Sequence, residues 1–140
     1  MNRLSGKVAF VTGAGGVIGR GICLTLAEMV RALRDATEAE AAAVINRDGS
    51  VVAADLPPVV SQETFSIMCA AILGAGMTAS TELRHSAPHR VLLESEDATI
   101  LIQEVGRRAM LVLVVPPEQP IAQLDSVVSR FGQAAAKEID

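Results

Sequence analysis

The sequence predicts an α/β domain, because short apolar runs typical of β-strands alternate with longer helical stretches. An Asp-Gly pair at residues 48–49 separates two such runs, 41–46 and 50–54, and this is the strongest local signal for a β-hairpin. Three further runs between residues 89 and 115 are separated by short turns, which join only antiparallel neighbours. A long helical stretch, 62–84, lies between the hairpin and this three-strand meander.

The first part of the chain combines a strand, a glycine loop and an amphipathic helix. Lys7–Thr12 is predicted to be a short strand, and the glycine-rich stretch Val11–Gly21 runs into a helix expected at about Ile22–Ala36. We therefore predict an N-terminal glycine-rich segment, 1–21, followed by a single domain, 22–140. With no Trp or Tyr and three Phe in 140 residues, the core of this domain should be aliphatic.

Local signals set the ends of the remaining elements. Pro57 and Pro58 should end the second hairpin strand, since proline cannot donate to a ladder. Ser61 is the expected N-cap of the long helix. Three prolines, 116, 117 and 120, should stop the meander and begin a last helix, whose apolar stripe is Ile121, Leu124, Val128, Phe131, Ala135 and Ile139.

The long helix has no charged face between its ends. One stripe of side chains suits packing on a sheet and comprises Phe65, Met68, Cys69, Ile72, Gly76, Ala79 and Leu83. The opposite face is uncharged as well and comprises Ile67, Ala70, Gly74, Met77, Thr78 and Thr81. Uncharged, partly apolar surface of this kind marks an interface. Its cover is either a second subunit, which makes these six residues a candidate dimer interface, or a terminal segment of the same chain.

Composition argues against several functions. The net charge of −4 is mild and the basic residues are scattered, so nucleic acid is not an expected partner. Residues 64–81 carry no charge, but their Thr, Ser and Gly content is too polar for a membrane span. Cys23 and Cys69 suit reduced, buried thiols of a cytoplasmic protein.

No cluster of side chains predicts catalysis or metal binding. His85 and His89 have no second ligand pair nearby, and the acidic residues at 94–97 are expected at a solvated turn. Serines 66, 80 and 95 lack the context of an activated nucleophile. Arg107 and Arg108 could meet an acidic partner or remain in water. We therefore expect no enzyme activity, no cofactor and no metal.

The order helix, hairpin, long helix, meander and helix resembles the roadblock family, which includes dynein light chains and bacterial GTPase regulators. Its carrying segments are AAAVINRDGSVVAADLP, QETFSIMCAAILGAGMTASTELR, HRVLLESEDATILIQEVGRRAMLVLVVPP and PIAQLDSVVSRF, over about residues 24–131. The resemblance implies a five-stranded antiparallel sheet between helices. It also implies a homodimer formed through the long helix and the neighbouring edge strand. The function implied is that of a non-catalytic scaffold or regulator of a small Ras-like GTPase.

Residues 4–28 are instead similar to the start of a short-chain dehydrogenase/reductase. Thr12, Gly13, Gly16 and Gly19 match the TGxxGxxG form of that family's loop, whose backbone amides approach a pyrophosphate. The chain has no Tyr and therefore lacks the YxxxK dyad of that family. Hairpin and meander also replace the strand-helix-strand units that a doubly wound fold needs. A truncated or fused nucleotide-binding element is accordingly the alternative interpretation.

Overall fold

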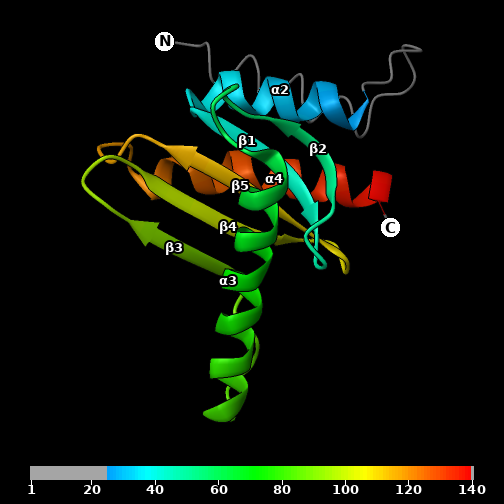
Figure 1. Ribbon diagram of the computed structural model, residues 1–140, viewed down its shortest axis with the longest axis vertical. Coiled ribbons are helices and arrows are strands. Elements are labelled where there is room, and N and C mark those ends of the chain that lie inside the picture. Colours follow the sequence, from blue (N-terminus) through cyan, green and yellow to red (C-terminus); the bar gives the residue numbers. More distant parts are fainter. Residues whose placement is uncertain (1–24, 140) are drawn as a thin grey trace.

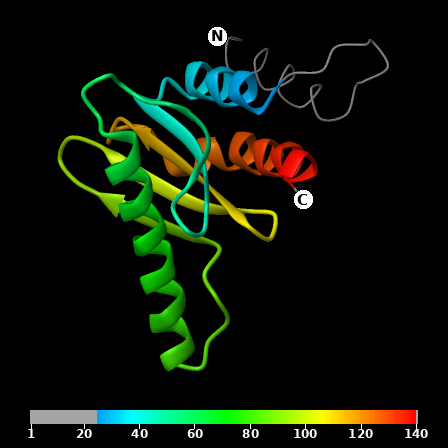
Figure 2. The ribbon, with the colours of Figure 1, turned by 45° about the vertical axis from the view of Figure 1, so that its right-hand side comes forward.

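The computed structural model describes residues 25–139, which form a five-stranded antiparallel sheet with helices on both faces (Figure 1). Two helices, α2 and α4, cover one face and α3 covers the other (Figures 1 and 2). The strand order is β2-β1-β5-β4-β3, and every pair is antiparallel. The elements are α2 (Leu26–Thr37), β1 (Ala41–Asn46), β2 (Val51–Asp55), α3 (Gln62–Glu82), β3 (Arg90–Glu94), β4 (Thr99–Val105), β5 (Ala109–Val115) and α4 (Ile121–Ile139).

This architecture confirms the predicted fold and the predicted order of elements from the hairpin onward. The expected strand Lys7–Thr12, the glycine loop and the proposed boundary at residue 21 lie outside the described residues.

The Asp-Gly turn forms the β1–β2 hairpin as predicted. Gly49 adopts a φ of +93°, a backbone conformation that side chains with a Cβ rarely take. The Asp48 carboxylate accepts hydrogen bonds from the Ser50 hydroxyl at 2.6 Å and the Ser50 backbone N–H at 2.8 Å. These bonds from Ser50 hold the pKa of Asp48 below its usual value. The turn is therefore stabilised both by the backbone conformation of Gly49 and by the hydrogen bonds between Asp48 and Ser50.

Side-chain caps define where two helices begin. Thr25 and Glu28 form a capping box at the start of α2, with the Thr25 Oγ1 accepting from the Glu28 N–H at 3.1 Å. Ser61 caps α3 as predicted, and its Oγ accepts from the Thr64 N–H at 3.3 Å. Each cap satisfies a backbone donor that has no partner within its own helix.

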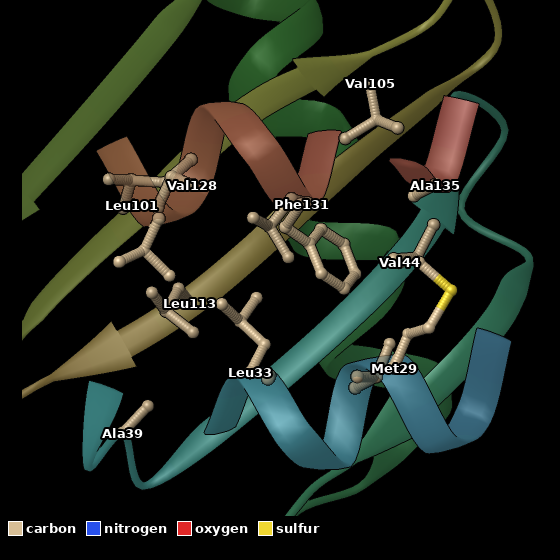
Figure 3. Packing of buried hydrophobic residues seen from close by; sticks show 14 of the residues in the cluster. Met29, Leu33, Ala39, Val44, Leu101, Val105, Leu113, Val128, Phe131 and Ala135 are labelled. Carbon is tan, nitrogen blue, oxygen red and sulfur yellow. The ribbon is translucent and has the colours of Figure 1, made fainter. Parts of the chain in front are cut away.

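The larger core lies between the sheet and the pair α2 and α4. Phe131 of α4 is fully buried there, and Figure 3 shows its ring among side chains of α2 and of the sheet. Met29 and Leu33 contribute from α2, while Val44 and Leu113 contribute from β1 and β5. The apolar stripe predicted for the last helix is the one that packs inward, with Leu124, Val128, Phe131 and Ala135 all buried.

The smaller core lies between the sheet and α3. Its fully enclosed members are Ala43, Ile45, Cys69, Leu73, Ile102, Met110 and Val112. The central strand β5 is buried along its whole length, because it has a strand on each side and a helix layer on each face. The C-terminal half of α3 projects beyond the sheet (Figures 1 and 2).

Candidate functional site

The exposed side of α3 is the main candidate site. Of the 21 residues of this helix only Ser66, Cys69 and Leu73 are buried. Its charged residues, Glu63 and Glu82, stand near its two ends. The helix therefore presents an uncharged surface to solvent along most of its length, unlike an ordinary surface helix.

The structure separates the six predicted interface residues into two groups. Ile67 is 45% exposed, and Gly74, Thr78 and Thr81 are exposed on the same side of α3. A Cβ added at Gly74 would meet nothing within 4 Å, so this position faces open space. Ala70 and Met77, in contrast, are partly buried and pack against the core beneath the helix.

The stripe predicted to face the sheet is wrong in part. Met68 is 54% exposed and Leu83 is 69% exposed, and Ala79 is exposed as well. Ser66 and Leu73, which belong to neither predicted face, point into the core together with Cys69 of the predicted stripe. The reason is that a helix with small or apolar residues on all sides has no polar side to fix its rotation about its own axis.

Several exposed residues that the sequence reasoning did not single out belong to this surface. Ala71 and Ala75 are exposed and lie one helical turn apart on α3, next to Met68. Together with Ile67 and Gly74 they form what we term the α3 face: Ile67, Met68, Ala71, Gly74, Ala75 and Thr78. Its small side chains would allow another backbone to come close.

Among residues 25–139, strand β3 lies at the edge of the sheet with a neighbouring strand on one side only, and α3 contacts it. Val91 packs in the core beneath α3, and its Cγ2 would lie 3.5 Å from a Cβ at Gly76. Leu93, two residues further along the strand, points to the same side of the sheet. Leu93 is also 38% exposed, so β3 offers an exposed apolar side chain on the face of the sheet that α3 covers.

The opposite edge of α3 meets the β1–β2 turn. The Arg47 guanidinium donates to Met77 Sδ at 3.2 Å, to Glu104 Oε1 at 2.8 Å and to the Arg107 carbonyl at 3.2 Å. Gly49 lies against Ile67, since a Cβ there would come within 3.1 Å of both Cα and Cγ1 of Ile67. The β1–β2 turn of the same chain therefore borders α3 at Ile67 and Met77.

The other candidate residues are not brought together into a reactive site. The His89 side chain is exposed, and its Nδ1 lies 3.2 Å from Glu104 Oε2. His85 lies in the segment between α3 and β3. Within residues 25–139 no group of three His, Cys, Asp or Glu side chains could hold a metal ion. The exposed residues Glu94, Glu96 and Asp97 surround the β3–β4 turn, and Arg107 and Arg108 occupy the β4–β5 turn.

The remaining polar candidates have structural positions. The Ser66 hydroxyl is buried with no hydrogen-bond partner, and Ser95 donates to the Ala98 carbonyl at 3.0 Å within a turn. Cys69 is a free, buried thiol as predicted, and burial raises its pKa from 9.0 to about 11. Cys23 and the loop residues Thr12, Gly13, Gly16 and Gly19 lie outside the described part of the chain.

By length and composition alone, α3 is the one helix among the described residues that could cross a membrane. In the folded domain this helix instead packs on the sheet through Cys69 and Leu73. The helix is therefore a core helix of this domain.

Comparison with known proteins identifies a family with this architecture. The family model described as Roadblock/LC7 domain matches residues 25–115. An uncharacterized protein of Methanocaldococcus jannaschii, MJ0714, is 31% identical over 70 residues, which are 50% of this chain and 59% of that protein. The match therefore spans less than two thirds of that relative.

Two solved structures share the fold at low sequence identity. MglB of Myxococcus xanthus superposes with a TM-score of 0.76 at 10% identity, over 81% of this chain and 94% of that one. The gliding protein MglB of Thermus thermophilus gives a TM-score of 0.69 at 22% identity, over 80% and 86%. At these identities the likeness is one of fold.

Proposed function

This chain belongs to the Roadblock/LC7 family, and on that premise we propose that it is a non-catalytic, dimeric binding module that scaffolds or regulates a small Ras-like GTPase in the cytoplasm. The observation that carries the proposal is the α3 face, which is uncharged and exposed from Ile67 to Thr78. A soluble domain that leaves such a surface uncovered is prone to associate.

The proposed dimer uses the α3 face together with edge strand β3. Ala71, Gly74 and Ala75 would allow two copies of α3 to approach closely, while Met68 and Leu93 would supply apolar area at the same contact. Pairing of two β3 edges would satisfy backbone groups that have no partner strand among residues 25–139. Of the residues proposed from the sequence, Ile67, Gly74 and Thr78 belong to the α3 face, and Thr81 is exposed on the same side of the helix.

The proposed action on a GTPase follows from binding. A module without catalytic groups can change the nucleotide state of a GTPase only by contacting its two states differently, because equal binding to both states shifts nothing. The family resemblance supports a Ras-like GTPase as the partner.

Self-association is tested by light scattering coupled to size exclusion. We expect the wild-type chain to be a dimer at micromolar concentration and Gly74→Glu to be monomeric but folded, because the substitution places a charge at the centre of the α3 face. Gly74→Ala is the matched control and should remain dimeric, since the space at this position accepts a methyl group. A monomeric wild-type chain would exclude the dimer.

The partner is tested by capture from an extract of the source cells with the wild-type chain and with Gly74→Glu. Recovery of a Ras-like GTPase by the wild-type chain, followed by a change in its nucleotide hydrolysis or exchange on addition of the purified module, would support the proposal. Nucleotide hydrolysis by the purified chain alone, or no GTPase among the captured proteins, would contradict it.

A further inference from the structure

The β1–β2 turn touches α3 at two well-separated points. Gly49 lies against Ile67, and Arg47 donates a hydrogen bond to Met77 Sδ at 3.2 Å. Ten residues of α-helix span about 15 Å, so the two contacts lie far apart along the axis. Two separated contacts restrain the angle of a helix as well as its position.

The turn is itself held firmly by the rest of the sheet. Arg47 Nη2 donates to Glu104 Oε1 of β4 at 2.8 Å, and its Nε donates to the Arg107 carbonyl at 3.2 Å. The Arg47 backbone N–H donates to the Arg108 carbonyl at 3.1 Å. The β1–β2 turn and the β4–β5 turn lie at the same end of the sheet (Figures 1 and 2). The β1–β2 turn is therefore hydrogen-bonded both to β4 and to the β4–β5 turn.

Helix α3 is packed less deeply than the other two helices. It buries three of its 21 residues, whereas α2 buries five of 12 and α4 buries six of 19. One of its three buried residues is Ser66, whose hydroxyl has no hydrogen-bond partner. Contacts at the edge of α3 consequently carry more weight than they would for a deeply packed helix.

We propose that the β1–β2 turn sets the position of α3 on the sheet, with Arg47 and Gly49 as positioning residues, and thereby controls the strength of the self-association. Only the effect on self-association rests on the proposed dimer; the effect on the position of α3 does not. Gly49 allows the close approach because a Cβ there would come within 3.1 Å of the Ile67 Cα and Cγ1, a tight contact that Ile67 would have to shift to accommodate. Arg47 joins the helix to Glu104 through a single guanidinium.

Hydrogen exchange of the α3 amides and the dimer dissociation constant test this inference together. Arg47→Ala and Gly49→Ala should each accelerate exchange in α3 while the β1 and β5 amides keep their protection. Each should also weaken the dimer by about tenfold or more. Arg47→Lys retains the charge beside Glu104 but loses the three simultaneous guanidinium hydrogen bonds. Its α3 exchange rate and dimer dissociation constant should fall between those of the wild type and those of Arg47→Ala.

Two control variants separate positioning from general damage. Gly132→Ala makes the same substitution on α4, on the other face of the sheet from α3, where a Cβ would meet nothing within 4 Å. Arg130→Ala removes an exposed arginine from α4. Neither should change α3 exchange selectively. Unchanged exchange in α3 for both Arg47→Ala and Gly49→Ala would overturn the inference. A monomeric wild-type chain whose α3 still loosens in these variants would leave the positioning role standing and refute the dimer.

Discussion

Arg34 of α2 and Asp55 of β2 are joined by a charged hydrogen bond of 2.8 Å between Nη1 and Oδ1. The same Nη1 donates to the Asp55 carbonyl at 3.3 Å, so the helix is tied to both the side chain and the backbone at the end of an edge strand. Both side chains are less than one third exposed. We expect Arg34→Met to lower the free energy of unfolding by about 1–2 kcal/mol.

Urea unfolding of the Arg34→Met variant measures this contribution directly. Arg130→Met, which removes an exposed arginine of α4, is the matched control and should change stability by less than about 0.5 kcal/mol. Equal losses in the two variants would mean that the Arg34 contacts contribute nothing specific.

The unpaired hydroxyl of Ser66 makes a second prediction. It is fully enclosed beneath α3 and has no hydrogen-bond partner, so its desolvation is not compensated. Ser66→Ala should therefore raise the free energy of unfolding by about 1 kcal/mol. Ser126→Ala, at an exposed position of α4, should have almost no effect. A clear loss of stability in Ser66→Ala would show that the hydroxyl has a partner after all.

Cys69 provides a pH-dependent prediction. Burial raises the pKa of its thiol to about 11, above the unfolded value of 9.0, so folding disfavours the thiolate. The stabilising contribution of the neutral thiol is complete below pH 9 and is lost as pH rises through about 11. Cys69→Ser should show less loss of stability over this pH interval than the wild-type chain.

The same thiol should react slowly while the domain is folded. In a Cys23→Ser background, we expect little alkylation of Cys69 by iodoacetamide at about pH 8 and full alkylation in concentrated urea, because the thiol is neutral and enclosed. Rapid alkylation of the folded protein would show that α3 opens readily from the sheet.

Removal of the N-terminal segment tests the proposed domain boundary. A chain beginning at Arg20 should remain soluble and unfold cooperatively, because residues 25–139 already supply a five-stranded sheet and two clusters of buried apolar side chains. Calorimetric titration of the full chain with NADH and NADPH should likewise show no binding. Loss of cooperative unfolding after truncation, or binding that disappears in Gly13→Ala, would give the glycine loop a role that we do not assign to it.

The sequence predicts the elements of this fold well because their boundaries are set locally. The Asp-Gly turn at Asp48, the cap at Ser61 and the prolines after β5 each act within a few residues, and the structure confirms all three positions. The rotation of α3 is different, since Met68 and Leu73 are similar in hydrophobicity and their neighbours give no contrast. Only the contact with the sheet decides which of them is buried.

The uncertain rotation of α3 also limited how well its exposed residues could be predicted from the sequence. Gly74 and Thr78 were assigned to the face opposite the sheet and lie there, whereas Met77 was assigned to the same face and instead packs inward beside Arg47. No pattern in the sequence relates Arg47 to Met77, because their contact depends on how the hairpin lies across the helix.

The pairing of β1 with β5 determines the order in which this domain can fold. The β1–β2 hairpin and the β3–β5 meander join neighbours in sequence, whereas Ala41 must find Val114 across most of the domain. Closing so large a loop costs entropy before any contact offsets it, so this step should limit the folding rate. Substitutions in β1 and β5 should then slow folding, while those in α3 should mainly speed unfolding.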